Sequence, residues 1–180
     1  LSGEKGIGKS TLAYHLVNYS LSKNDDYSYD VKNLQINSNN RDFKLINNYC
    51  NPNFNLIDIK NDKKNIDITQ IRELIERLNK SSLNSKPRFV LIDNIEFLNT
   101  NSINALLKTL EEPNDNIYFI LINNDKKVLS TLTSRCLSFK ISLSNEQSKE
   151  IITNLIKAIN VSKLKVKNII FLPALISADL

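Results

Sequence analysis

The 180-residue chain contains no methionine and no tryptophan, and it has only three glycines, four prolines, two cysteines and one histidine. Cys50 and Cys136 do not form a C-x-x-C pair, and His15 is the one further soft ligand in the sequence. A zinc site or a disulfide framework needs more such residues, so we expect two reduced thiols and no bound zinc. An apolar run long enough to cross a bilayer and a signal-peptide pattern are also missing, which predicts a cytoplasmic protein without a membrane partner.

Charge of either sign is not concentrated anywhere along the chain. Lysine and arginine number 24 and aspartate and glutamate 19, which gives a net charge of +5. The basic residues are scattered among acidic ones, and this favours an ordinary solvated surface over direct contact with nucleic acid. With 41% hydrophobic residues the chain can form a core, and its length allows one complete domain and part of another.

All three glycines lie within the first eleven residues, LSGEKGIGKST. Residues 3–10 fit the phosphate-binding loop pattern G-x-x-x-x-G-K-[ST] without a mismatch, and the alternative is a glycine-rich turn with a chance Lys-Ser pair. In such a loop, backbone N–H groups turn toward phosphates, the lysine reaches the β and γ oxygens, and the hydroxyl ligates Mg²⁺. The sequence therefore predicts a site for ATP or ADP with Mg²⁺ that is formed by Gly3, Gly6, Gly8, Lys9, Ser10 and Thr11.

The segment 11–21 after this loop is predicted to be a helix whose N-terminus points at the phosphates. We expect His15 to be a packing residue of this helix, because no carboxylate partner can be assigned to it. A phosphate loop normally connects a buried strand to a helix, but only Leu1 and Ser2 precede it and no initiating methionine is present. We therefore expect a fragment whose first strand is truncated.

The remaining chain alternates between strand-like and helix-like patterns. Residues 22–53 are rich in Asn, Asp, Lys and Ser and predict an irregular insertion with a short helix over 41–48. Apolar runs predict buried strands over 54–59, 88–92 and 118–122, and an alternating strand nearer the sheet edge over 137–143. Helices are predicted from Asp67 with a Gln70 capping box, over 101–112, and from Ser144 with a Gln147 capping box, and two helical pieces over 161–180.

Asp93 directly follows the apolar run 88–92. A carboxylate at the C-terminal end of a buried strand, in a chain with a phosphate loop, is typical of the second residue directed at Mg²⁺; the alternative is a simple strand-ending aspartate. Strands that alternate with helices after such a loop predict a three-layer α/β fold with a parallel sheet. The nucleotide is then expected at the C-terminal ends of the strands.

Two segments resemble the clamp-loader branch of the AAA+ ATPases: FVLIDNIEFLNTNSINALLKTLEEP and LSTLTSRCLSF. The runs N-A-L-L-K-T-L-E-E-P at 104–113 and S-R-C at 134–136 are hallmarks of the gamma/tau and delta-prime subunits of bacterial DNA polymerase III. NPNFNLIDI and IDITQIRELIERL are similar to the corresponding delta-prime segments. The resemblance extends from residue 1 to about residue 160. It implies an N-terminally truncated AAA+ nucleotide-binding domain over 1–143 and the start of an α-helical lid over 144–180.

The resemblance also implies roles for single residues. Residues 3–10 would form the Walker A loop, and Asp93 would be the Walker B aspartate that holds Mg²⁺ together with Ser10. Asn123 would lie in the sensor-1 neighbourhood, to within one residue. Arg135 would be an arginine finger that reaches the nucleotide of a neighbouring subunit in trans, whereas its local sequence alone suggests a surface arginine.

Two departures from the family pattern bear on function. Active relatives have Glu after the Walker B aspartate, where this chain has Asn94, which cannot accept a proton. We therefore expect negligible ATPase activity unless Glu96, two residues further along, takes over. The cysteine cluster of many relatives is missing after the first helix, where only Cys50 remains, so a bound zinc is not expected.

These features favour a delta-prime-like clamp-loader subunit. Its expected partners are the gamma/tau and delta subunits in a ring, the sliding clamp, and primer–template DNA through the complex. One alternative is a hydrolysing gamma/tau-type subunit, which the complete phosphate loop favours and Asn94 disfavours. Another is a P-loop small-molecule kinase, which leaves the S-R-C and N-A-L-L-K-T-L-E-E-P runs unexplained.

Overall fold

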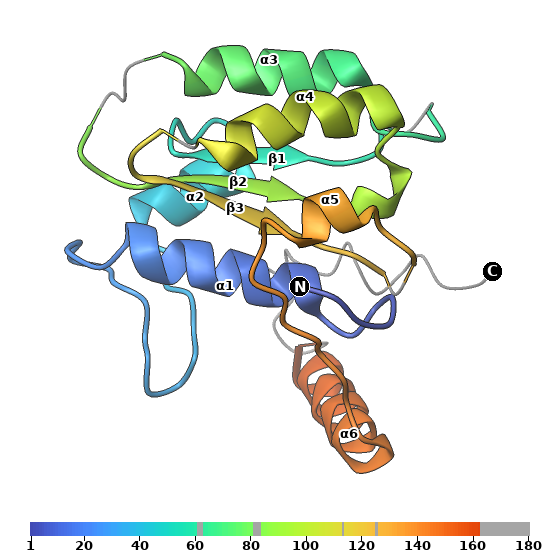
Figure 1. Cartoon of the computed structure of the whole chain (residues 1–180). Coiled ribbons are helices and arrows are strands. Elements are labelled where there is room, and N and C mark those ends of the chain that lie inside the picture. Colours follow the sequence, from blue (N-terminus) through green and yellow to red (C-terminus); the bar gives the residue numbers. More distant parts are fainter. Residues whose placement is uncertain (61–62, 81–83, 113, 125, 163–180) are drawn as a thin grey trace.

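The computed structural model describes residues 1–60, 63–80, 84–112, 114–124 and 126–162. The helical pieces predicted for the tail lie almost entirely outside these residues. Within the described chain, strands and helices alternate as the sequence predicts (Figure 1).

The sheet has three parallel strands in the order β1 (Phe54–Ile57), β2 (Arg88–Ile92) and β3 (Ile117–Leu121). Phe54 pairs with Phe89 at the start of β1, and Arg88 pairs with Ile117 at the start of β3. The three predicted buried strands are therefore confirmed. The first is two residues shorter than predicted, which leaves Asp58 just beyond its end.

Helices cover both faces of this sheet. Figure 1 shows α3 (Ile68–Leu78) and α4 (Thr100–Glu111) on one face and α1 (Lys9–Leu21) on the other. The expected three-layer α/β fold is therefore confirmed. The other elements of the described chain are α2 (Arg41–Asn47), the 3₁₀ helix η1 (Ile95–Phe97), α5 (Ser130–Thr133) and α6 (Asn145–Ser162).

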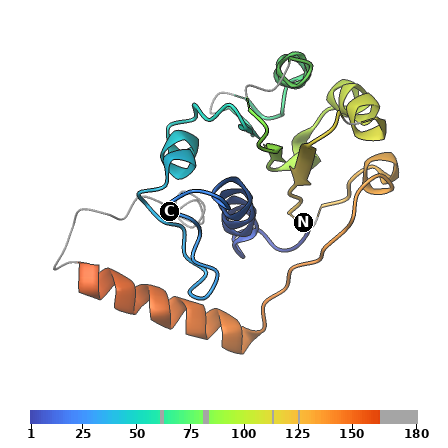
Figure 2. The ribbon, with the colours of Figure 1, turned by 90° about the vertical axis from the view of Figure 1, so that its left-hand side faces the viewer.

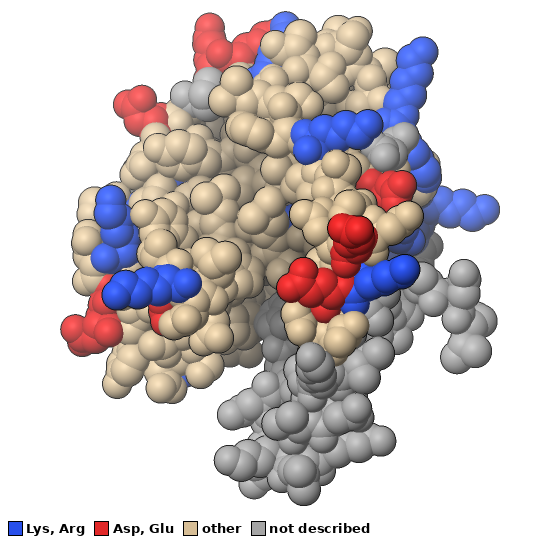
Figure 3. Space-filling model, turned by 90° about the horizontal axis from the view of Figure 1, so that it is seen from below, with Lys and Arg blue, Asp and Glu red and all other residues tan. Residues whose placement is uncertain are grey.

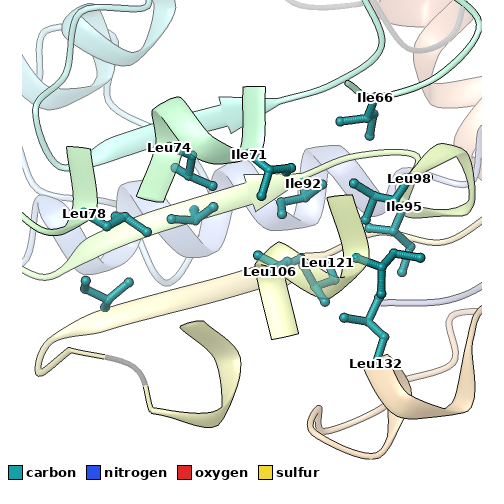
Figure 4. Close-up of a cluster of buried hydrophobic side chains, with 13 residues drawn as sticks. Ile66, Ile71, Leu74, Leu78, Ile92, Ile95, Leu98, Leu106, Leu121 and Leu132 are labelled. Atoms are coloured by element: carbon teal, nitrogen blue, oxygen red, sulfur yellow. The ribbon is translucent and has the colours of Figure 1, made fainter. Parts of the chain in front are cut away.

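β2 is buried on both of its faces because it lies between two hydrophobic clusters. Val90 and Ile92 pack into the cluster under α3 and α4, which Figure 4 shows in close-up. Phe89 and Leu91 point the other way, into the cluster under α1. Full burial of one such side chain contributes about 2 kcal/mol to stability, so both layers hold the strand that ends at Asp93.

Helix α3 begins with the capping residues that the sequence predicts. The Asp67 side chain accepts a hydrogen bond from the Thr69 amide, and the Gln70 side chain accepts one from the Asp67 amide. Ile66 and Ile71, on either side of the cap, are both fully buried. The capping box is confirmed. The sequence also predicts Ile66 and Ile71 to form a hydrophobic staple, and the burial of both side chains agrees with this.

The strand predicted over 137–143 is wrong. In this segment Lys140 forms an isolated bridge with Ser2, through hydrogen bonds of Ser2 with Phe139 and Ile141. The physical reason is that a strand needs a ladder of backbone bonds, and in the described structure the pairing of this segment is limited to Ser2. The alternation in sequence therefore does not produce a buried face, and Leu137 is 86% exposed.

The insertion after α1 is fastened to the sheet by Lys86, just before β2. Its ammonium donates to the Leu21 carbonyl at 2.9 Å, to Asp42 at 2.7 Å and to Asp25 at 3.1 Å. Burial alone would lower the pKa of Lys86, but the bonds to Asp42 and Asp25 outweigh this and raise it. The predicted short helix is confirmed as α2, whose Ile46 packs into the cluster under α1.

Helix α6 stands apart from the sheet and its covering helices (Figure 2). The predicted capping box is present, because Ser144 and Gln147 exchange side chain–backbone hydrogen bonds of 2.9 and 3.2 Å. The sequence also predicts an apolar stripe on this helix, but the side chains that would form it, Ile152, Leu155, Ile156 and Ile159, lie outside the described part of the structure. The domain boundary between residues 143 and 144 stays a prediction.

In the view of Figure 3, basic and acidic side chains are interspersed on the surface and do not form a continuous basic stripe. No helix in the described ranges has the length and apolarity needed to span a membrane.

Candidate nucleotide-binding site

The loop before α1 depends on its glycines. Gly6 and Gly8 have φ angles of +87° and +94°, in the region that disfavours residues with a Cβ atom. A Cβ at Gly3 would lie 2.2 Å from the Ile141 carbonyl oxygen, so this glycine permits close contact with the segment after α5. The glycine spacing that predicts a phosphate loop thus corresponds to a backbone that only glycines readily adopt.

Lys9 is folded into this loop. Its side chain is only 3% exposed, and its ammonium donates to the carbonyl oxygens of Gly3 at 2.8 Å and Glu4 at 2.6 Å. The first turn of α1 contains no acidic residue, and no side-chain hydrogen bond caps it in the described structure. A buried cation and the N–H groups of a 13-residue helix therefore create a positive environment suited to an anion.

Ser10 and Asp93 meet at the same end of the sheet. The Ser10 hydroxyl donates to Asp93 Oδ2 at 2.5 Å, and the Asn94 amide donates to Asp93 Oδ1 at 2.8 Å. Burial raises the pKa of Asp93, and the nearby charge of Asp58 acts in the same direction, while the bond from Ser10 opposes it. The Asp93 carboxylate and the Ser10 hydroxyl are oxygen donors in contact, and the hydrogen bond between them does not neutralise the charge of the carboxylate. Oxygen donors of this kind are the ones that Mg²⁺ prefers.

A hydrogen-bonded chain joins the ends of all three strands beside this pair. The Asn94 side chain donates to Asp58 Oδ1 at 2.7 Å, beyond β1, and accepts from the Asn124 side chain at 2.8 Å, beyond β3. Asn94 itself has a φ of 58°, a conformation that asparagine tolerates better than most residues. Asp58 was missed from the sequence because it lies inside the predicted strand 54–59, whereas Asn124 lies within the one-residue margin of the Asn123 assignment.

The side chains of Glu96 and Asn123 have different hydrogen-bond partners. The Asn124 amide group donates to Glu96 Oε1 at 3.1 Å, so Glu96 belongs to the same network as Asn94. The Asn123 side chain instead donates to the Lys126 carbonyl at 2.8 Å, in the loop after β3. Of the two neighbouring asparagines, Asn124 is therefore the one whose side chain reaches the Asp93–Asn94 end of β2.

Tyr14, on α1, lies close to the acidic residues of the site. Burial raises the pKa of its hydroxyl to about 12, with contributions from Tyr49 and then from Asp93 and Asp58.

His15 bonds to the Tyr29 hydroxyl at 2.8 Å and stacks edge-on against its ring, in keeping with the packing role predicted for it.

Of the other predicted site residues, Thr11 is exposed in the first turn of α1. Arg135 lies after α5, and its bonds in the described structure go to Glu111, Thr131 and Ser134, none of which belongs to the phosphate loop. Among the residues that the structure describes, no group of three or more His, Cys, Asp or Glu side chains could hold a metal ion. Cys50 and Cys136 are free thiols.

Comparison with known proteins places the chain in a family. Residues 1–145 match the family described as DNA polymerase III, delta subunit. The chain is 32% identical over 148 residues to the DNA polymerase III subunit gamma of Buchnera aphidicola subsp. Schizaphis graminum, covering 82% of this chain and 38% of that protein. It is 32% identical over 144 residues to the subunit delta' of Buchnera aphidicola subsp. Baizongia pistaciae, covering 76% of this chain and 41% of that protein.

A solved structure of a DNA polymerase III gamma subunit-related protein from Thermotoga maritima is also similar, with a TM-score of 0.47 and 23% identity over 61% of this chain and 38% of that chain. The chain spans 38% to 41% of the length of the two Buchnera relatives. Because the family match covers residues 1–145, the chain belongs to the DNA polymerase III delta subunit family, a family of clamp-loader subunits that includes delta-prime.

Proposed function

We propose that this chain is the nucleotide-binding part of a delta-prime-like clamp-loader subunit, which binds ATP or ADP with Mg²⁺ and hydrolyses it negligibly. The observation that carries the proposal is the convergence of Lys9, Ser10 and Asp93 at the N-terminus of α1. When bound, the nucleotide would supply the phosphates that such a loop cradles, and Mg²⁺ would neutralise part of their charge. Lys9 and the α1 amides would bind the phosphates, while Ser10 and Asp93 would hold the cation.

The lack of hydrolysis is inferred from Asn94. Its side chain donates to Asp58 and accepts from Asn124, so both ends of the amide are engaged. An amide cannot act as a general base, and this one is also fixed by its two partners. We assign the sensor-1 role to Asn124, because its side chain contacts Asn94 while that of Asn123 turns to the Lys126 carbonyl.

A hydrolysing gamma/tau-type subunit is the second candidate function. The observation that favours it is the Glu96 carboxylate, which Asn124 joins to the Asn94 network. If Glu96 polarised the attacking water, Glu96→Gln would abolish phosphate release by the chain. A small-molecule kinase receives no support from the family match.

In the assembled ring, this subunit would pack against gamma/tau and delta subunits and act with the sliding clamp on primer–template DNA. Arg135 would reach the nucleotide of a neighbour in trans, because a planar, permanently charged guanidinium suits the charge that develops on a transferred phosphoryl group. Arg135 is only partly buried, with one third of its side chain exposed, which is compatible with contact to another subunit.

Reconstitution of the ring with full-length subunits tests the finger. Arg135→Ala should lower DNA- and clamp-stimulated hydrolysis, although less than the roughly 10³- to 10⁵-fold known for a GTPase finger, because several sites contribute to the total. Nucleotide affinity of this subunit and ring assembly should not change. Arg72→Ala, at an exposed position of α3, is the matched control. Wild-type hydrolysis by the Arg135→Ala ring would overturn the assignment.

A further inference from the structure

The guanidinium of Arg135 is held by two helices. Its Nη2 donates to Glu111, the last residue of α4, and its Nη1 donates to the Thr131 carbonyl of α5 at 2.7 Å. A longer contact of 3.5 Å joins Nη1 to the Ser134 hydroxyl. One end of the guanidinium is therefore fixed to α4 and the other to the turn from which Arg135 itself projects.

These bonds leave part of the guanidinium available. An arginine side chain has five N–H donors in a planar fork, and the bonds to Glu111, Thr131 and Ser134 use three of them. The Nε–H and one Nη2–H have no bonding partner among the described residues. Glu111 thus orients the fork without occupying all of its donors.

Glu111 belongs to a longer helix than the one that precedes Arg135. Helix α4 has 12 residues, and its N-terminus is capped by Asn99, which accepts from the Ser102 amide at 2.8 Å. Ile103 and Leu106 fix the same helix to the core. Arg135 follows a helix of only four residues, whose Leu132 is buried in the same core. Glu111 therefore joins the guanidinium to a second, longer helix than the one from which Arg135 projects.

The pair contributes little to stability, because its side chains are 33% and 49% exposed and solvent-exposed ion pairs gain little. We propose that Glu111 is a positioning residue that orients Arg135 toward the neighbouring subunit. This inference rests on the proposed trans role of Arg135. It predicts that the charge of Glu111 affects hydrolysis in the ring while the stability of this chain hardly depends on it.

The reconstituted ring with full-length subunits tests this inference through Glu111→Gln. We expect stimulated hydrolysis to fall about tenfold, the lower end of what loss of an orienting partner costs at other sites, with an unchanged unfolding midpoint. Glu112→Gln, at the adjacent exposed carboxylate, is the matched control and should leave the rate within about twofold. Glu111→Asp should recover part of the rate.

Two further variants separate positioning from structure. Arg135→Ala should remove most of the effect of Glu111→Gln when both are combined, because Glu111 acts through Arg135. The exchange Glu111→Arg with Arg135→Glu retains an ion pair between the helices but should leave stimulated hydrolysis as slow as in the Arg135→Ala ring. If Arg135→Ala slows the ring and Glu111→Gln does not, or if Glu111→Gln acts equally without Arg135, the positioning role is wrong. If Arg135→Ala itself changes nothing, the proposed finger fails instead.

Discussion

The Ser10 hydroxyl and the Asp93 carboxylate are 2.5 Å apart, although 83 residues separate them in the chain. Ser10 lies in the first turn of α1 and Asp93 directly after β2, so this bond joins the helix on one face of the sheet to the end of its central strand. A cation bound between them would replace the hydrogen bond with two ligand contacts. The Ser10–Asp93 pair therefore both joins α1 to the sheet and forms the proposed Mg²⁺ site.

Replacement of Asp93 by Asn should stabilise the chain in the absence of nucleotide. Burial raises the pKa of Asp93, so its charge opposes folding, whereas the neutral amide can still bond to Ser10 and to the Asn94 amide. The sign of the pH dependence follows from linkage. The gain over wild type should be small below pH 3.8, the ordinary value for this carboxyl, and grow as the pH rises through the raised pKa.

Chemical unfolding of wild type and Asp93→Asn between pH 3 and pH 8 measures this gain. Asp26→Asn, at an exposed aspartate, is the control and should show no such increase. A variant less stable than wild type at pH 7 would mean that the carboxylate is stabilised by its partners. In the same variant, Mg²⁺-dependent nucleotide binding should be weakened.

A double-mutant cycle should detect the bond between Asp58 and Asn94. Asp58→Ala and Asn94→Ala should each destabilise the chain by about 1 kcal/mol, and their combined effect should be less than the sum by about the same amount. Asp30→Ala with Asn94→Ala is the control pair, since Asp30 bonds locally to Asn33. Strict additivity of Asp58→Ala and Asn94→Ala would contradict the network.

Removal of Lys86 should loosen the insertion. Lys86→Ala leaves Asp42, which is only 7% exposed, without its ammonium partner, and we expect a loss of about 2–3 kcal/mol in unfolding free energy. Lys44→Ala, at an exposed position of α2, should change stability by less than about 0.5 kcal/mol. Equal effects of the two variants in urea titrations would show that Lys86 does not fasten the insertion.

Local signals account for what the sequence predicted correctly. The caps of α3 and α6, the apolar runs of the three strands and the glycines of the loop each act within a few residues, and each appears in the fold. The Ser10–Asp93 contact was also predictable, because a phosphate loop and a strand-ending carboxylate both lie at the C-terminal edge of a parallel sheet.

The features that the sequence does not reveal depend on contacts that a local pattern does not contain. The alternation over 137–143 predicts a strand, but pairing also needs a neighbour, and Ser2 provides only an isolated bridge. Likewise, Asn123 and Asn124 are identical in type, and only the backbone direction after β3 decides which side chain meets Asn94. The bonds of Lys86 to Asp25 and Asp42 span more than 40 residues each and have no sequence signature.

Equilibrium titration of the full-length protein with a fluorescent ATP analogue, with and without Mg²⁺, tests the central claim most directly. The account predicts saturable binding that Mg²⁺ strengthens, that Lys9→Ala abolishes, and that Lys5→Ala, at an exposed position of the same loop, leaves intact. Absence of binding, or equal affinities for wild type and Lys9→Ala, would contradict it.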